Sequence, residues 1–312
     1  MTEGLRELFW ILIFPGFVFT LGLGLLVSWV VRKVSARVQW RKGPPLIQPL
    51  WDVLKLAGKE VLIPEQANKT IFIGAPMAGM AGVLLLSTML WRITISQSAF
   101  VGDIIVAMYL MVLPSLALIL GSSASASPHA ALGSSREMKL VMSYELPLVL
   151  ALIVVVIKTG SISLAAIATQ APIASISGAL AFAVGVLCVQ AKLGFVPFDI
   201  AESETEIAGG LLIEYSGVLL AIWKIMQAMM LVALPLFMVM VFMGGFGTSG
   251  WSVVWGTGKF LIVVVLLILI KNTNPRLRID QAMKFFWVFC GPTLAAAVIL
   301  AMVGDAYGIG WL

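Results

Sequence analysis

The chain has 312 residues, of which 61% are hydrophobic and 11% are charged, and its formal net charge is +5. Its mean hydropathy of +1.06 excludes a soluble globular protein, because too few polar side chains are present to cover a water-exposed surface. The apolar runs have the length of a membrane-spanning helix, about 20 residues, whereas a membrane barrel would show alternating segments of about 10 residues. The composition therefore predicts an all-α, multi-pass membrane protein.

The apolar runs predict about eight transmembrane helices in a single integral membrane domain, residues 1–312. The N-terminal run lacks a small-residue cleavage site followed by a soluble domain, so we expect a retained first span rather than a removable signal peptide. The sixth run is too long for one upright helix, and Pro235 within it indicates a kink, a tilt or an early exit. In chain order the predicted spans are residues 8–31, 71–91, 103–120, 140–157, 173–189, 211–242, 253–270 and 285–302.

The connection between the first two spans, residues 32–70, contains the segment PPLIQPLWDVLKLAGKE. Apolar residues recur through this segment, and charged residues such as Asp52 and Lys55 are interspersed among them. The pattern predicts an amphipathic helix that lies in the plane of the membrane interface. A simple surface helix whose lysines reach the lipid headgroups explains the pattern better than a specific binding role does.

Lysine and arginine are distributed unevenly between alternate loops. About fifteen of them fall on one side and about four on the other, with Lys224 inside a span. The positive-inside rule then predicts a protein of the cytoplasmic membrane with both termini outside and with the acidic loop, residues 190–210, in the cytoplasm. This face carries both acids and bases, and such a surface can hold a soluble partner.

Acidic residues crowd into one window at the start of the sixth run, PFDIAESETEIAGGLLIEYSG. Carboxylates at the edge of hydrocarbon are costly unless they face a protein interior or a wet cavity, so the window is a candidate functional site. A helix after Pro197 would place Glu202 and Glu206 one turn apart, where like charges push a proton onto one of them. A solvated acidic loop is the alternative. The candidates for a coupling or proton path in this window are Asp199, Glu202, Glu204, Glu206 and Glu214.

Two further charged residues fall inside predicted spans. Glu145 lies about 10 Å inside the fourth span at about 1.5 Å per residue, and it needs a partner there. Lys224 lies near the middle of the sixth run, where a charge costs about 3 kcal/mol unless it faces other helices or water, so it indicates an internal polar path. A purely structural pair between helices explains Glu145 equally well. The candidate partners of Glu145 by depth and sign are Arg136, Lys139, Lys192 and Lys224.

The loop before the last span, KNTNPRLRIDQAMKF, carries Arg276, Arg278 and Asp280. Two arginines at this spacing can clamp carboxylates of the acidic loop or of another protein chain. Together with Arg41 and Lys42 these are the candidate residues for partner docking. An ordinary positive flank of a membrane span explains them nearly as well.

The chain offers little to hold a cofactor or a metal. Cys188 and Cys290 each lie in an apolar run without a CxxC partner, and His129 is the only histidine. No iron–sulfur or zinc site is predicted, so any redox centre is expected in another chain, and we expect no catalytic residue and no cofactor in this one.

The acidic window resembles the signature of the H subunit of complex I, the NADH:quinone oxidoreductase, and of its relatives in energy-converting membrane-bound hydrogenase and sulfane reductase complexes. Three other segments agree with this family in the same order along the chain, namely LIQPLWDVLKLAGKEVLIP, ALGSSREMKLVMSYELP and NPRLRIDQAMKFFW. Four ordered motifs across nearly the whole chain are far more specific than any one of them.

The resemblance implies a membrane subunit that docks a peripheral electron-transfer arm and begins a polar path toward antiporter-like subunits. It implies that the acidic window is the coupling loop and that Glu145, Glu214 and Lys224 continue it in the membrane. The implied partners are the large catalytic and iron–sulfur subunits of the arm, small and antiporter-like membrane subunits, and lipid, with no nucleic acid. Iron–sulfur clusters and, in hydrogenase relatives, a nickel–iron site would reside in those partners.

The chain departs from the quinone-type pattern of this family in two places. The stretch before the surface helix is only QWRKGPPLIQPL, and Phe195 stands two residues before PFD, where that pattern has arginine. Both departures lie where a quinone would enter and be held. We therefore expect a quinone-free relative that couples ferredoxin-driven hydrogen evolution, or sulfur or polysulfide reduction, to proton or sodium translocation.

Three alternatives remain open from the sequence. The first is a quinone-chamber subunit of an NADH- or ferredoxin:quinone oxidoreductase. The second is a stand-alone secondary transporter, against which the chain shows no internal repeat. The third is a structural anchor whose acids only bind basic patches on the arm.

Overall fold

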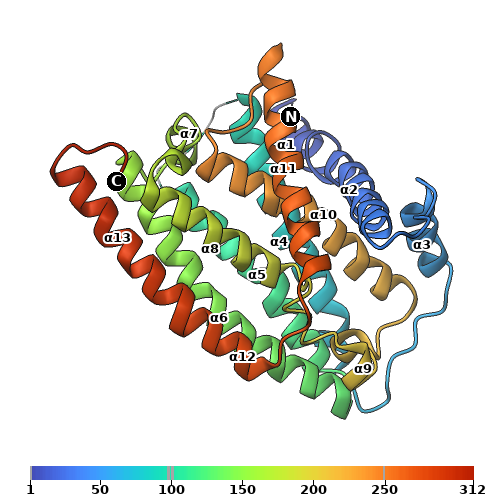
Figure 1. Cartoon of the computed structure of the whole chain (residues 1–312). Coiled ribbons are helices and arrows are strands. Elements are labelled where there is room, and N and C mark those ends of the chain that lie inside the picture. Colours follow the sequence, from blue (N-terminus) through green and yellow to red (C-terminus); the bar gives the residue numbers. More distant parts are fainter. Residues whose placement is uncertain (1, 97–98, 100–101, 249) are drawn as a thin grey trace.

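The computed structural model describes residues 2–96, 99, 102–248 and 250–312, apart from the side chains of residues 2, 3, 204 and 205. This part of the chain is helical and has no strand (Figure 1). Its longer helices are α1 (Thr2–Leu12), α2 (Phe17–Val38), α3 (Gln48–Ala57), α4 (Lys69–Ser96), α5 (Asp103–Ser123), α6 (Pro128–Thr159), α8 (Ile176–Lys192), α10 (Gly217–Phe242), α11 (Trp251–Thr273) and α13 (Gly291–Ala306). Its short helical pieces are α7 (Leu164–Ile167), η1 (Pro172–Ala174), α9 (Glu204–Ile207), η2 (Gly210–Leu212), α12 (Ile279–Lys284) and the π-helical η3 (Phe285–Cys290).

The helices of the described residues have the lengths that membrane spans require. Seven helical segments are long and apolar enough to cross a membrane, and α8 is a shorter apolar helix. The predicted class, a multi-pass all-α membrane protein, is confirmed. The first span is divided into α1 and α2 around Pro15. Its ring cannot donate the backbone hydrogen bond that a continuous helix would need.

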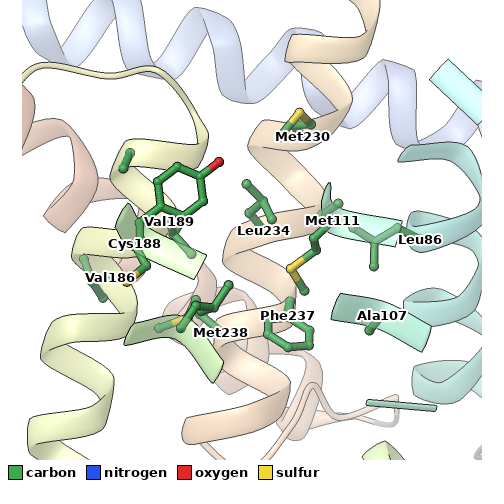
Figure 2. Packing of buried hydrophobic residues seen from close by; sticks show 14 of the residues in the cluster. Leu86, Ala107, Met111, Val186, Cys188, Val189, Met230, Leu234, Phe237 and Met238 are labelled. Carbon is green, nitrogen blue, oxygen red and sulfur yellow. The ribbon is translucent and has the colours of Figure 1, made fainter. Parts of the chain in front are cut away.

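The central helix of the bundle is α10. In its most apolar window 89% of the residues are buried, compared with 28% in α11. A helix that is apolar on all sides is expected in the interior, and α10 packs against α2, α4 and α8. Figure 2 shows Leu234 of α10 between Cys188 of α8 and Met111 of α5, in one apolar cluster with Phe237 and Met238. The core is therefore built around this one helix.

The sixth span begins later than the sequence predicted. Residues 211–216 lie in the short turn η2 and the loop after it, and α10 starts only at its N-terminal glycine. Gly209 and Gly210 have φ values of 101° and 51°, in the left-handed region that interrupts a helix. Beyond that point α10 continues through Pro235 without ending. The excess length of the sixth run is therefore resolved at its N-terminal end.

The connecting segment forms α3, which lies against α2 and α10. Arg32 Nη1 donates to Asp52 Oδ2 at 2.6 Å, and Gln48 Nε2 donates to Asp52 Oδ1 at 2.9 Å. Leu50 and Leu54 are exposed, so α3 has an apolar face that the rest of the described chain does not cover. The placement of this face in the membrane interface stays a prediction.

Candidate functional site

A cavity of about 470 Å³ lies among α2, α3, α5, α6, α10 and the loop that follows α8. Part of its lining is apolar and comes from residues such as Leu25, Met226 and Leu231. The charged lining is balanced between four cations and four acids, and this balance reduces the cost of burying charge. These charged residues are Arg32, Asp52, Glu137, Lys192, Asp199, Glu202, Lys224 and Lys271.

One cavity residue, Lys192 at the last turn of α8, forms an ion pair with Glu145 of α6. Lys192 Nζ lies 2.6 Å from Glu145 Oε1, and the lysine side chain is 0% exposed. The same Nζ donates to the carbonyl oxygen of Met111 at 3.3 Å and lies 5.1 Å from the centre of the Tyr144 ring. Lys192 is therefore the partner of Glu145 among the four candidate cations.

Glu137 of α6 is a second buried acid in this region, and the sequence interpretation left it out of the site. Because α6 begins at Pro128, Glu137 lies in the third turn of the helix rather than before it, and only 8% of the residue is exposed. Its side chain lies near that of Ser115 on α5, and both residues line the cavity. Ser115 Oγ lies 3.4 Å from the hydroxyl of Tyr144. The sequence does carry a signal for the position of Glu137, because this acid and Glu145 are spaced two helical turns apart and a continuous helix places both acids on one face.

The acidic loop does not form the helix that would have placed its carboxylates on one face. Residues 198–203 are irregular, and the helix is limited to α9. Asp199 Oδ2 accepts from Arg276 Nη2 at 2.8 Å, and Glu206 Oε2 accepts from Arg136 Nη1 at 2.5 Å. The acids therefore reach arginines on two other segments of the chain instead of repelling one another.

Glu202 leads from the acidic loop to α10 through a short hydrogen-bonded series. Gln227 Nε2 donates to Glu202 Oε1 at 2.9 Å, and Lys224 Nζ donates to Gln227 Oε1 at 3.2 Å. Lys224 is exposed in this chain and lies about two turns from the start of α10, so its predicted place near the middle of a span was wrong. The late start of the helix is the reason.

Lys271 at the end of α11 is another cavity residue that the sequence treated only as a positive flank. Its Nζ lies 4.2 Å from the centre of the Phe195 ring, within range of a cation–π interaction. Asp199 and Glu202 are close enough to interact with its charge. Phe195 stands where the quinone-type pattern has an arginine, but Lys271 still supplies a positive charge at this part of the cavity lining.

Several predicted residues lie away from this cluster. The side chain of Glu204 falls outside the described residues. Glu214 is half-buried and does not line the cavity. The remaining residues predicted for docking are exposed on the surface, and they are Arg41, Lys42, Arg278 and Asp280.

Asp199 has a pKa near the physiological range. Burial raises the pKa of Asp199 from 3.8 to about 6, Arg276 and Lys271 oppose the shift, and Glu202 adds to it. Since the folded value exceeds the unfolded one, the stability from proton binding is complete below pH 3.8 and is lost as the pH rises through about 6. Asp199 can therefore gain or release a proton under conditions close to neutrality.

Replacing Arg276 by glutamine should raise the pKa of Asp199 further, because the guanidinium at 2.8 Å favours the ionised carboxylate. We expect the titration of Asp199, followed by infrared difference spectroscopy, to move up by about one pH unit. Arg278→Gln is the matched control, because Arg278 is exposed and two residues away. An unchanged titration in Arg276→Gln would show that the ion pair does not govern Asp199.

The cluster is suited to holding and moving charge rather than to binding a metal. Among the residues that the structure describes, no group of three or more His, Cys, Asp or Glu could hold a metal ion. A buried lysine that pairs with Glu145, the buried acid Glu137 and a carboxyl group that titrates near neutrality instead line one cavity. Perturbed groups of this kind cluster at functional sites.

Comparisons with known proteins agree with one another. A family model described as NADH dehydrogenase matches residues 11–302. The chain is 34% identical over 291 residues to the H subunit of NADH-quinone oxidoreductase from Dehalococcoides mccartyi, covering 89% of this chain and 81% of that protein. The H subunit of the same-named enzyme from Syntrophotalea carbinolica is 34% identical over 313 residues, covering 94% and 95%.

A solved structure shows the same fold as well. A chain in the membrane-bound sulfane sulfur reductase, an archaeal respiratory membrane complex, superimposes with a TM-score of 0.85. It is 27% identical to this chain, and the match covers 96% of this chain and 100% of that one. The likeness in fold therefore extends over nearly the whole chain.

Proposed function

Because this chain belongs to the NADH dehydrogenase family, which includes the H-type membrane subunits of complex I-like complexes, we propose that it docks a peripheral electron-transfer arm and couples the redox reaction of that arm to proton or sodium translocation. The chain itself takes no part in electron transfer. Iron–sulfur clusters and, in a hydrogen-evolving complex, a nickel–iron site would belong to the partner subunits.

The observation that supports coupling is a graded series of charged groups from the surface to the interior. Glu206 is 55% exposed on the acidic loop, Asp199 is 16% exposed at the cavity, and Lys192 is 0% exposed in its pair with Glu145. Ionisable groups inside a membrane bundle are costly and usually mark an ion path. A charge change at the loop would alter the electrostatic energy of each group further in, because a low-dielectric interior screens it poorly.

Docking is assigned to the side of the molecule that carries the acidic loop. The loop, residues 190–210, and the connection that contains α3, residues 32–70, would lie in the cytoplasm with both termini on the other side of the cytoplasmic membrane. Their exposed charges would meet the arm, and small and antiporter-like membrane subunits would pack against the lipid-facing helices. Arg41, Lys42, Arg278 and Asp280 are the exposed residues assigned to this contact.

The reaction of the arm is inferred from the similarity to the sulfane sulfur reductase and from the departures at the quinone position. We assign the chain to a complex that reduces sulfur or polysulfide, or that evolves hydrogen, with ferredoxin as the electron donor. Phe195 and Lys271 form the wall where the quinone-type pattern has an arginine. A stacked lysine is a poorer substitute for a planar, always-charged guanidinium in holding a polar head group.

The coupling role is tested with Glu202→Gln in the assembled complex in sealed vesicles. Glutamine keeps the shape of the side chain but cannot carry the charge or the proton. We expect electron transfer through the arm to persist while ion translocation falls by about 100-fold, the scale of a lost proton-transfer group.

Glu65→Gln is the matched control, because Glu65 is exposed and does not line the cavity. Wild-type ion translocation in both Glu202→Gln and Glu145→Gln would contradict the proposed path. Loss of electron transfer together with translocation would instead indicate that the arm no longer docks.

A quinone-chamber role is the second candidate, and the cavity itself favours it. Its volume of about 470 Å³ lies within the range of small-molecule sites, and part of its lining is apolar. Reduction of a soluble quinone by the purified complex, blocked by bulkier residues at Leu25 or Leu231, would establish this role. An absence of quinone reduction would favour the sulfur- or proton-reducing assignment.

A further inference from the structure

The interior of the bundle holds a buried ammonium group at Lys192, a buried carboxyl group at Glu137 and a partly buried one at Glu145, whose side chain is 22% exposed. Lys192 pairs with Glu145 at 2.6 Å, and Glu137 lies about two turns away on α6. Glu137 and Lys192 line the same cavity, and their charges are close enough to interact. One cation therefore lies near two acids and forms an ion pair with one of them, Glu145.

Charge balance decides how many protons this group holds. A buried carboxylate without a cation is so costly that it takes up a proton instead. Lys192 neutralises Glu145 in this structure, and Glu137 forms no ion pair among the described residues, with the Ser115 hydroxyl as a polar group near it. A neutral carboxylic acid is satisfied by a hydroxyl group, whereas a carboxylate there would be uncompensated. The proton therefore belongs on Glu137 in this arrangement.

Other polar groups besides Glu145 surround the ammonium group. Lys192 Nζ donates to the carbonyl oxygen of Met111, one helical turn from Ser115 on α5, and it lies over the ring of Tyr144. The Tyr144 hydroxyl is 3.4 Å from Ser115 Oγ, which leads on to Glu137. Polar groups thus line the route along which the flexible lysine stem would swing from one acid to the other.

We propose that Lys192 is a shared cation that pairs with Glu145 and Glu137 in turn, and that the acid it does not hold carries a proton. When Nζ leaves Glu145 and pairs with Glu137, Glu137 releases its proton toward the cavity and Glu145 takes one up on its own side. The ammonium group keeps its three protons throughout, so one proton enters and one leaves per swing. The use of this swing as a step in ion translocation rests on the proposed function. The number of protons that the two acids hold in the resting complex does not depend on it.

The other titratable groups that face this set are few. Glu202 of the acidic loop is close enough to interact with the charge of Glu137, and Tyr144 lies between the two acids in the sequence of α6. Cys188 of α8 is near Lys192 and Glu145, and Cys290 of η3 is near Cys188. Phenols and thiols ordinarily keep their protons at neutral pH. Glu202 is the remaining acid, and it is hydrogen-bonded to Gln227 at the cavity wall. It is the natural acceptor of the proton that Glu137 releases.

The test counts protonated carboxyl groups in the resting, assembled complex by infrared difference spectroscopy, variant minus wild type. We expect Glu137→Gln to remove one carboxylic-acid band. Glu145→Gln should remove the same band, because Lys192 then pairs with Glu137 and Glu137 loses its proton. Lys192→Met should add one band, since both acids are then protonated, and Glu65→Gln should change nothing.

A band that persists in Glu145→Gln, or no loss in Glu137→Gln, would overturn the shared cation. Should Lys192→Met fail to assemble, the two glutamine variants still decide the question, because each leaves the lysine one carboxylate. Ion translocation is measured on the same samples. If both glutamine variants lose the carboxylic-acid band as expected but still translocate ions at the wild-type rate, only the proposed function is contradicted. If both variants lose ion translocation while their bands stay unchanged, only the shared cation is contradicted.

Discussion

The double variant Glu137→Gln/Glu145→Gln should be destabilised by about 3–5 kcal/mol, far more than the sum of its two single variants. In each single variant Lys192 still has one carboxylate within reach. In the double variant the ammonium group, with its side chain 0% exposed, has none. Removing the partner of a buried charge is among the largest effects that point substitutions have. The measurement is thermal or denaturant unfolding of the purified complex in detergent.

The coupling between the two positions is the decisive quantity. A double-variant cycle should give a strong interaction energy, whereas acids that act separately would give additive losses. Adding Lys192→Met to the double variant is the rescue control, because it removes the unpaired ammonium group and should restore most of the stability. Additive losses without rescue would show that the two acids do not share the lysine.

Gly24→Ala should destabilise the bundle by about 1–3 kcal/mol through overpacking of a tight helix contact. A Cβ atom at Gly24 of α2 would lie 2.5 Å from the carbonyl oxygen of Ala228 on α10, and backbone atoms cannot move aside as a flexible side chain can. The two helices would have to separate, and both of them line the cavity. We therefore expect the ion-translocation rate to fall together with the melting temperature.

Gly22→Ala on the same helix is the matched control with the opposite expected sign. No atom lies within 4 Å of a Cβ at Gly22. Alanine is a better helix former than glycine by about 1 kcal/mol, so this variant should be neutral or slightly stabilised. Equal losses in both variants would mean that glycine serves the flexibility of α2 rather than its contact with α10.

The membrane class and the eight apolar helices were predictable because each span is a local property of about 20 residues. The start of the sixth helix was not, since Leu211 and its neighbours are as apolar as the span itself. Gly209 and Gly210 adopt positive φ just before it, and the first residues of the apolar run form a turn and a loop instead of helix. Hydropathy measures the cost of transfer into lipid, and it carries no information on backbone dihedrals.

The candidate site was only partly predictable for the same kind of reason. Glu145 was recognisable as a charge inside an apolar run, but Lys192 was only one of four cations compatible with its depth. Glu137 was mistaken for a loop residue because the apolar run starts three residues after it. Its burial comes from the packing of α6 against α5 and α8, which no local pattern encodes.

The sequence by itself determined that this chain spans a membrane as a helical bundle, that its acids gather at one loop and that its family is that of the H subunits. Apolar length, charge scarcity and motif order suffice for these conclusions, since each is a property of consecutive residues. Only the tertiary structure decided which lysine meets Glu145, that Arg276 and Arg136 separate the acids of the loop, and that Glu137 lies inside. The three ion pairs join residues 47, 77 and 70 positions apart, and the packing of whole helices around α10 sets them.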